Sequence, residues 1–300
     1  MYVITGATGN TGSVISEKLL EKDAKVRVIG RDAKKLERFT KNGAEPFVAD
    51  VTDPAALVRA FSGATAVYAM IPPNISAPDV PAYMNRVSDA LTDALTKDGV
   101  AHAIVLSSFG ADKPDRTGPV AGLHNLENKL GRIAALNALF LRPGYFMENL
   151  LPQVSVIQSF GMMAGPVRPD LPLPFIATRD IGMVAADSLL KLEFQGKQYR
   201  ELLGARDVTY MEVARIIGAA IGKPDLKYQQ MPQAQLKPAL MQMGMSSSMG
   251  DELFELADAL NSGHIRAMEP RSPANTTPTT VETFIADSFV PAYRGKAART

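Results

Sequence analysis

Three glycines near the start of the chain have a spacing that suits the binding of a phosphate group. The segment TGATGNTG, residues 5–12, follows a short apolar run and opens an amphipathic stretch, the context in which such glycines bind nucleotides. Gly6 would permit the tight turn, Gly9 the approach of a pyrophosphate and Gly12 the packing of helix on strand, while helix N-terminal amides bind the anion. The sequence therefore predicts a dinucleotide site, with a glycine-rich turn that binds nothing as the alternative. Additional donors in this turn would be Thr8, Asn10 and Thr11.

The end of the second predicted strand, at Arg31, bears on which dinucleotide is bound. Folds that select NAD usually place an acid there, which accepts hydrogen bonds from the ribose 2′-hydroxyl. A guanidinium instead suits a 2′-phosphate, because its planar donors are permanently charged, and Lys35 lies one turn further along. The sequence thus favours NADPH over NADH. Alternatively, Asp32 caps helix 33–40 and Arg31 is a solvated charge.

Two residues at the end of the third predicted strand, Asp50 and Val51 in the segment VADVTDP, are placed to contact the adenine. Ligands of such sheets bind at the carboxyl ends of the strands, so this role is compatible with the glycine turn. The alternative is a turn that precedes the helix starting at Asp53 and Pro54.

Apolar runs of strand length alternate with longer amphipathic stretches over the first half of the chain. The runs lie at 2–5, 25–30, 45–50, 64–71, 101–108 and 137–143. Strands that are apolar on both faces and separated by helices form parallel sheets covered on both sides. The pattern predicts an α/β fold with a doubly wound parallel sheet, a Rossmann domain over residues 1–150.

The pattern changes after residue 150. Glycines and prolines are too frequent in segment 158–175 for regular elements, so we interpret it as a crossing loop. Helical stretches and the short strand-like runs 197–205 and 225–230 follow. We predict a smaller C-terminal α+β cap domain over residues 151–300, with 176–192 packing back on the Rossmann sheet.

Bulk composition excludes several classes of function. Lysine plus arginine (32) nearly cancels aspartate plus glutamate (31), so no broad field would attract nucleic acid or an anionic membrane. Cysteine is absent, which excludes disulfides, thiol catalysis and zinc–thiolate sites, and we expect no metal site. No segment approaches the roughly 18 apolar residues of a membrane span, and no signal peptide is evident. We therefore expect a cytoplasmic protein.

Several segments resemble the NmrA-like branch of the atypical short-chain dehydrogenases/reductases. They are TGATGNTG, VADVTDP, LSSFGA, LRPGYFMENLL, TRDIGMVAADSL and TPTTVETFIADSF. The likeness spans nearly the whole chain and implies a Rossmann domain with a small C-terminal domain. The family includes NADPH-dependent quinone reductases, alkene and imine reductases, and regulators that bind a dinucleotide without turning it over.

The resemblance also implies which residues border the nicotinamide and the acceptor. Cofactor contacts would come from Met70, Ile71, Pro72, Ser108, Pro143, Gly144, Tyr145 and Phe146. The acceptor pocket would be lined by Phe109, Tyr145, Phe146 and Asn149. Arg179 and Asp180 look like the segment that ties the cap to the sheet, although a helix cap by Asp180 would explain them as well.

The residues for proton delivery depart from those of the wider superfamily, which uses Tyr-x-x-x-Lys after the fifth strand. Here that helix reads GLHNLENKLGR, residues 122–132, and has no tyrosine. His124 could carry a proton, as the resemblance to quinone reductases implies, Lys129 could bind the nicotinamide ribose, and Ser107 could orient a carbonyl. The alternatives are a structural histidine, a solvent-facing lysine and a serine bonded to local backbone.

We predict an NADPH-dependent reductase that transfers hydride to a small apolar acceptor, a quinone being the best candidate. A quinone needs mainly proximity and orientation, so the missing tyrosine does not forbid turnover. The alternative is an NAD(P)-binding redox sensor of NmrA type with a protein partner; either could act as a homodimer. Five methionines in 231–250 suit an adaptable pocket, or fill an irregular cap-domain core, which we favour.

Overall fold

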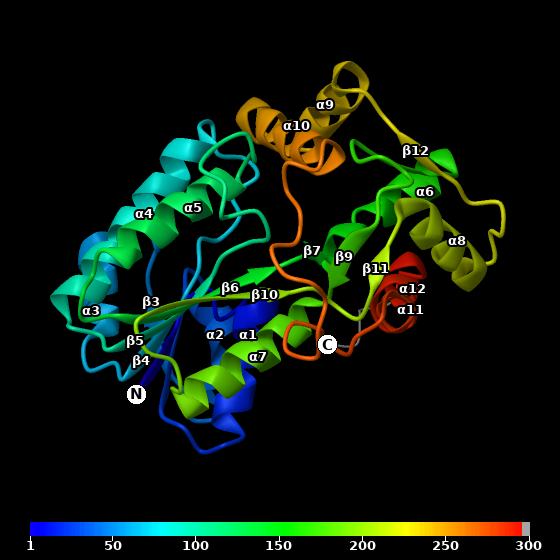
Figure 1. The fold of residues 1–300 in the computed structure, drawn as a ribbon. Coiled ribbons are helices and arrows are strands. Elements are labelled where there is room, and N and C mark those ends of the chain that lie inside the picture. The colour runs from blue at the N-terminus through cyan, green and yellow to red at the C-terminus, as the bar shows by residue number, and fades with distance from the viewer. Residues whose placement is uncertain (296–300) are drawn as a thin grey trace.

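A parallel sheet forms the centre of the computed structural model, which describes residues 1–295 (Figure 1). Its seven strands have the order β10-β6-β5-β4-β1-β2-β3, and every neighbouring pair is parallel. The strands are β1 (Tyr2–Ile4), β2 (Val26–Gly30), β3 (Glu45–Val48), β4 (Ala66–Ala69), β5 (His102–Leu106), β6 (Asn137–Pro143) and β10 (Lys197–Leu202). The prediction of a doubly wound parallel sheet is confirmed.

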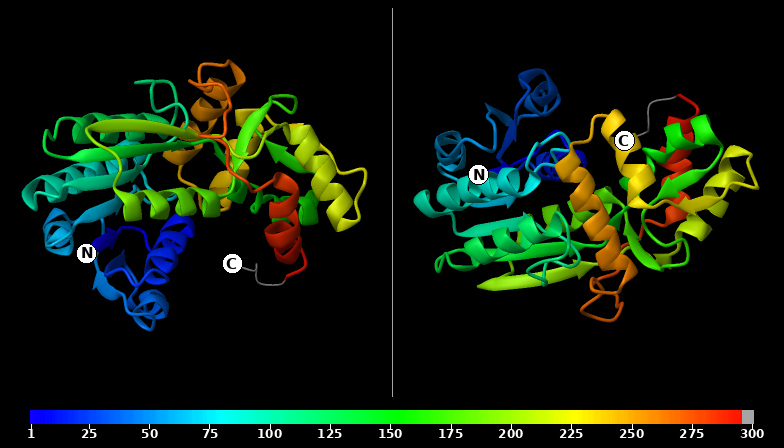
Figure 2. Two further views of the ribbon diagram at one scale, coloured as in Figure 1. Left: turned by 60° about the horizontal axis from the view of Figure 1, so that its bottom comes forward. Right: turned by 90° about the horizontal axis from the view of Figure 1, so that it is seen from above.

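Helices cover both faces of this sheet (Figures 1 and 2). One face carries α3 (Pro54–Phe61), α4 (Val80–Lys97) and α5 (Val120–Gly131). The other carries α1 (Asn10–Leu20), α2 (Ala33–Thr40) and α7 (Thr178–Lys191). Each layer has its own apolar core, because strands buried on both sides present aliphatic side chains to both helical layers.

Aspartates start three of the crossover helices. Asp32 accepts a hydrogen bond from the Lys34 amide at 2.9 Å, and Asp53 and Asp79 do the same at α3 and α4. An aspartate cap satisfies an amide that has no acceptor within the helix. The cap role that the sequence offered for Asp32 is thereby confirmed.

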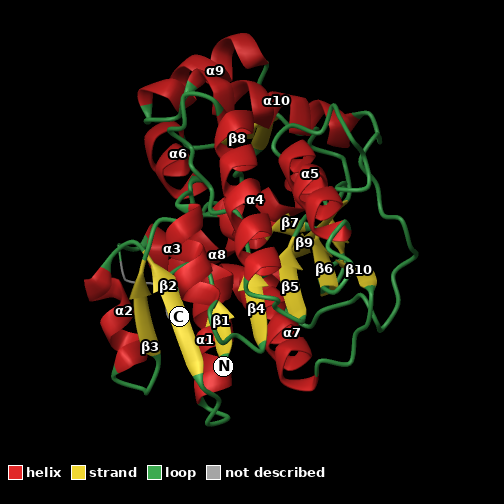
Figure 3. Cartoon of the chain, turned by 90° about the vertical axis from the view of Figure 1, so that its left-hand side faces the viewer, coloured by secondary structure: helices red, strands yellow, loops and turns green. Residues whose placement is uncertain are grey.

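The C-terminal lobe is built from short strands and helices around a core of its own. Its strands form two small sheets, β11-β9-β7 and β12-β8. Its elements are β7 (Tyr145–Phe146), η1 (Met147–Leu150), α6 (Gln153–Phe160), β8 (Met163–Gly165), β9 (Leu173–Ile176), β11 (Asp207–Val208), α8 (Tyr210–Ile221), β12 (Tyr228–Gln230), α9 (Gln233–Gln242), α10 (Ser247–Asn261), α11 (Val281–Phe284), η2 (Ile285–Phe289) and α12 (Val290–Tyr293). Helices α9 and α10 lie above the carboxyl ends of the central strands (Figure 3). No helix among the described residues has both the length and the apolar character of a membrane span.

After β9 the chain leaves this lobe, adds α7 and β10 to the Rossmann layers, and then returns to the lobe at β11. Helix α7 packs against α1. Strand β10 then pairs in parallel with β6 at the edge of the central sheet, whereas the sequence pattern placed 197–205 in the cap. An edge strand has one exposed side, and Tyr199 is half exposed, so the run lacks the continuous apolar character that marked the other strands.

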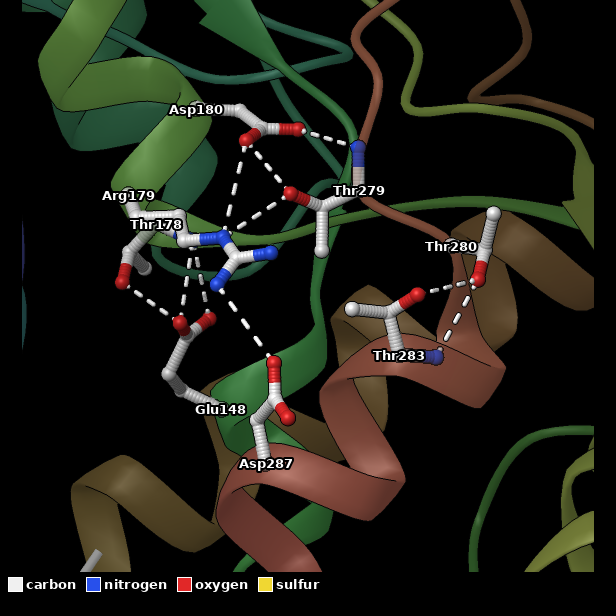
Figure 4. Close-up of polar contacts among 8 residues, drawn as sticks. All are labelled: Glu148, Thr178, Arg179, Asp180, Thr279, Thr280, Thr283 and Asp287. Carbon is white, nitrogen blue, oxygen red and sulfur yellow. Dashed lines mark hydrogen bonds and ion pairs between the residues drawn. The ribbon is translucent and has the colours of Figure 1, made fainter. Parts of the chain in front are cut away.

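A polar cluster ties the start of α7 to the C-terminal segment (Figure 4). The Asp180 carboxylate accepts from the amide of Thr279 at 2.9 Å and from its hydroxyl at 2.6 Å, and Arg179 donates to the same hydroxyl. Thr178 donates its hydroxyl to Glu148 at 2.6 Å. Burial raises the pKa of Glu148, and the hydrogen bonds from Thr178 partly offset this. These contacts join segments far apart in the sequence, whereas Asp180 does not cap its own helix.

Candidate active site

The glycine turn leaves the N-terminus of α1 open. Gly6 has a φ of +61°, and the Gly9 amide donates to its carbonyl oxygen at 2.9 Å. A Cβ atom on Gly12 would lie 2.3 Å from that same oxygen, so only glycine lets the helix begin this close to the strand. Gly9 caps the helix without a side chain, and the first-turn amides have no acceptor within the helix. The turn is therefore shaped to bind an anion such as a pyrophosphate.

The side chains of this turn differ in what they can reach. Asn10 is exposed and Thr8 is half-buried, so both are accessible to a ligand. Thr11 is buried, and its hydroxyl accepts a hydrogen bond from Tyr68 at 2.8 Å. Its side chain thus faces the sheet, and only its backbone amide is directed to the turn.

Arg31 lies exposed at the end of β2, close to Asp50 at the end of β3. Asp50 accepts hydrogen bonds from the amide and the hydroxyl of Thr52, at 2.9 and 2.8 Å. The amide hydrogen bond contributes most to lowering the pKa of Asp50, and the charge of Arg31 adds to it. The Asp50 side chain therefore forms the predicted turn, and Val51 behind it is buried. Adenine contacts by this pair remain a prediction.

A cavity of about 440 Å³ lies at the carboxyl edge of the sheet, between the strand ends and the C-terminal lobe. Helix α10 and the residue before its N-cap close one side through Met245, Met249 and Leu253. Predicted site residues in the lining are Met70, Ile71, Pro72, Ser107, Ser108, Phe109, Gly144, Tyr145, Phe146 and Asn149. Met70 also packs on the glycine turn, because a Cβ atom on Gly6 would lie 2.7 Å from its sulfur. The cavity and the turn are therefore neighbours.

The methionines of 231–250 do not fill a core, and that prediction was wrong. Met241 and Met243 are exposed, and Met231 is only partly buried. Met245 and Met249 line the cavity instead. Helix α9 buries none of its residues, so Met241, its one methionine, had no interior to fill.

His124 and Lys129 are not among the residues that line the cavity. The Nδ1 atom of His124 lies 2.8 Å from the Ala111 carbonyl oxygen, and its Nε2 lies 2.8 Å from the Asn128 amide nitrogen. Since a carbonyl only accepts, Nδ1 donates there and Nε2 accepts from Asn128. Lys129 pairs with Asp89 at 2.6 Å. His124 thus has the partners of a structural histidine, and Lys129 is held in an ion pair instead of facing solvent alone; the catalytic roles of both stay predictions. Pro143 also lies outside the lining, where its carbonyl accepts from the Phe109 amide at 2.9 Å.

A buried ion pair behind Ser107 was not anticipated from the sequence. Arg142, at the end of β6, donates to both carboxylate oxygens of Glu127 on α5, at 3.0 and 2.6 Å. Their side chains are only 7% and 4% exposed. The sequence did contain a sign of this pair: Glu127 lies on the apolar stripe of its helix, adjacent to Leu126 and within one turn of Leu130. A charge in such a stripe requires a buried partner.

This pair determines what the two serines of the site can do. Ser107 donates its hydroxyl to Glu127 at 2.5 Å, so it presents only lone pairs to the cavity. Ser108 donates to the Phe109 carbonyl oxygen at 3.1 Å. Neither hydroxyl is free to donate to an acceptor carbonyl, which is the role predicted for Ser107.

Fold and site together define a Rossmann-type α/β protein with an apolar cavity beside its glycine turn. Residues 2–285 match the model of the NmrA-like family, and the chain belongs to this family. The resemblance noted in the sequence is thereby confirmed. An NAD(P)H azoreductase from Xenophilus azovorans is 29% identical over 258 residues, which are 85% of this chain and 86% of the azoreductase.

Two solved structures share the fold over nearly all of the chain. An NADPH-dependent quinone oxidoreductase from Escherichia coli, complexed with NADPH, has a TM-score of 0.73 at 22% identity and covers 100% of this chain and 96% of its own. A triphenylmethane reductase from Citrobacter sp., complexed with NADP(H), has a TM-score of 0.79 at 19% identity and covers 94% and 98%. At these identities the two structures establish the fold.

Proposed function

We propose that this protein is an NAD(P)H-dependent reductase of a planar, apolar, conjugated acceptor, with a quinone as the best candidate and NADPH as the preferred reductant. The observation that carries the proposal is the apolar cavity that meets the glycine turn at Met70. The described lining contains no aspartate, glutamate, histidine, lysine or arginine, so it favours an aromatic ligand that carries no localised charge. The activities of the azoreductase, the quinone oxidoreductase and the triphenylmethane reductase support the same class of reaction.

The residues at the strand ends fit a dinucleotide. The amides at the start of α1, beside Gly9, would bind its pyrophosphate, and Arg31 would bind a 2′-phosphate. A Cβ atom on Gly144 would collide with the Pro174 carbonyl oxygen. Glycine at this position therefore lets the chain pass close to the cavity without a side chain. When bound, the reduced nicotinamide supplies a hydride.

The chain itself provides orientation and exclusion of water. The side chains of Met84, Leu123 and Leu256 give the cavity apolar walls, against which a planar acceptor loses its hydration and stacks. Met245 and Met249 can adapt their flexible thioethers to acceptors of different shape. Ser107, as an acceptor only, can bind an N–H or O–H group of a ligand.

Oxidation of NADPH in the presence of an acceptor tests the proposal. We expect turnover with quinones and other conjugated acceptors, because the cavity offers an apolar surface on which a planar ring system stacks and a simple ketone does not. Absorbance of NADPH is followed with a panel of quinones, azo compounds, enones and simple ketones, with NADH in parallel. Turnover with any acceptor rules out the alternative of a sensor without turnover, and NADPH binding without turnover across the panel would favour it.

Replacing Arg31 tests the preference for NADPH. We expect Arg31→Ala to weaken NADPH binding by about 10- to 100-fold, because a charge-assisted hydrogen bond contributes about 1.5–3 kcal/mol, while NADH binding stays unchanged. Calorimetric titration of both nucleotides measures the two constants. Arg38→Ala is the matched control, since it removes an exposed positive charge from the neighbouring helix α2. Equal losses for both nucleotides in Arg31→Ala would contradict the 2′-phosphate role.

A further inference from the structure

The cavity contains few groups that could supply a proton to an acceptor. Among the described residues of its lining, the only side chains that titrate are the phenols of Tyr83 and Tyr145. Reduction by hydride leaves a negative charge on the oxygen or nitrogen of a neutral acceptor, and a positioned acid can neutralise it. One of these two phenols is therefore the natural source of the proton within the cavity.

The other hydroxyl groups of the lining already donate elsewhere. Tyr83 donates to the Pro72 carbonyl oxygen at 2.9 Å. Ser107 donates to Glu127 at 2.5 Å and Ser108 to the Phe109 carbonyl oxygen at 3.1 Å. Each would have to give up a hydrogen bond before it could donate to a ligand, and such a loss is costly in a buried site.

Tyr145 is held in place by aromatic packing, and its hydroxyl accepts a hydrogen bond from the Tyr210 hydroxyl, so its own proton is left for a ligand. Its ring packs edge-on against Phe175 at 5.3 Å and Tyr210 at 6.2 Å between centroids, and Tyr210 stacks on Tyr228 at 4.4 Å. Burial raises the pKa of Tyr145, and the neighbouring Tyr210 hydroxyl lowers it in part. Tyr145 thus stays protonated at neutral pH and has a proton to give.

We infer that Tyr145 is the catalytic acid that protonates the reduced acceptor. This inference rests on the proposed reductase function. The hydride adds to one atom of the conjugated acceptor with two electrons, and the acceptor's oxygen or nitrogen then forms a bond to the proton of the Tyr145 hydroxyl. The O–H bond of Tyr145 breaks and leaves a phenolate, which takes a proton from water once the product leaves. Tyr145 transfers a proton only and is neither oxidised nor reduced.

Acceptors that differ in their demand for a proton separate this role from a structural one. Hydride addition to an azo compound leaves a strongly basic nitrogen, addition to a quinone leaves a weakly basic oxygen, and addition to a triphenylmethyl cation gives a neutral product that needs no proton. Loss of a catalytic acid should therefore slow azo reduction most, quinone reduction less and reduction of the cation not at all. A residue that only shapes the cavity would affect all three acceptors alike.

The experiment compares Tyr145→Phe, which keeps the ring and removes the hydroxyl, with wild type on these three acceptors. We expect kcat for an azo dye to fall about 100-fold or more, kcat for 2-methyl-1,4-naphthoquinone to fall less, and kcat for a cationic triphenylmethane dye to stay unchanged. Tyr228→Phe is the control, because it removes a buried hydroxyl from the same aromatic cluster, one that bonds the Val167 carbonyl oxygen. Its relative rates should match those of wild type.

An infrared measurement on the protein without nucleotide gives a readout other than turnover. A hydrogen bond from Tyr145 should lower the carbonyl stretching frequency of bound 2-methyl-1,4-naphthoquinone, and Tyr145→Phe should abolish the shift while Tyr228→Phe keeps it. Azo reduction at the wild-type rate by Tyr145→Phe, or an unchanged carbonyl frequency, overturns the proton transfer alone. Absence of turnover by wild type with all three acceptors refutes the reductase function, and the proton transfer with it.

Discussion

Gly12→Ala should weaken NADPH binding by about 100-fold, the largest effect on binding that we expect from a single methyl group. The added Cβ would lie 2.3 Å from the Gly6 carbonyl oxygen and 2.8 Å from its carbon. Neither atom belongs to a flexible side chain, so the turn itself must move. Because the α1 amides bind the anion only in this arrangement, a displaced turn loses them together. Calorimetric titration with NADPH gives the change in affinity directly.

The matched control for this substitution is Gly131→Ala. Gly131 is the last residue of α5, and nothing lies within 4 Å of the Cβ that alanine would add. Alanine is the better helix former by roughly 0.5–1 kcal/mol, so this variant should be as stable as wild type or more so, with unchanged NADPH binding. Wild-type affinity in Gly12→Ala would show that the nucleotide does not bind at this turn.

Strand positions in the first half of the chain could be predicted from the sequence. The run 137–143 coincides with β6, and the other five runs of the first half contain the observed strands with their ends trimmed. In β4, β5 and β6 both faces of the strand are covered by helices and nearly every residue is buried, whereas β3 is an edge strand whose residues are mostly exposed. Strand β10 was assigned to the cap domain instead of the central sheet, because at the sheet edge only its last two residues are buried and its run lacks the apolar character of an inner strand. Periodicity reports burial and does not report which neighbour buries a strand.

The residues of the candidate site also differ in how far the sequence could predict them. Residues fixed by backbone requirements, such as Gly6 and Gly12, could be predicted because few other residue types tolerate a positive φ or so close an approach. The cavity lining near Tyr145 came from the family resemblance. The partners of polar side chains could not be predicted, since the bonds of Ser107 to Glu127 and of His124 to Ala111 depend on distances between elements. Local sequence contains no measure of those distances.

Glu127→Ala should lower the free energy of unfolding by about 3–5 kcal/mol, the cost of leaving a buried charge without its partner. Arg142 would lose both of its bonds to the carboxylate, and its remaining contacts, with the Met268 sulfur and the face of the Tyr199 ring, do not neutralise a guanidinium. Urea unfolding followed by circular dichroism measures the change. Asp89→Ala is the control. It breaks an exposed pair with Lys129, which lies on the same helix as Glu127, and should cost at most about 1 kcal/mol.

A double replacement separates the charge from the packing around it. Glu127→Leu combined with Arg142→Met removes both charges and keeps apolar volume, so it should regain most of the stability that Glu127→Ala loses. In that variant the Ser107 hydroxyl no longer has an anionic acceptor and becomes free to donate into the cavity. If this variant gains activity toward simple ketones that wild type lacks, the buried pair is shown to set the direction of the Ser107 hydrogen bond. Equal unfolding free energies for Glu127→Ala and Asp89→Ala would instead show that Arg142 finds solvent or another partner when Glu127 is gone.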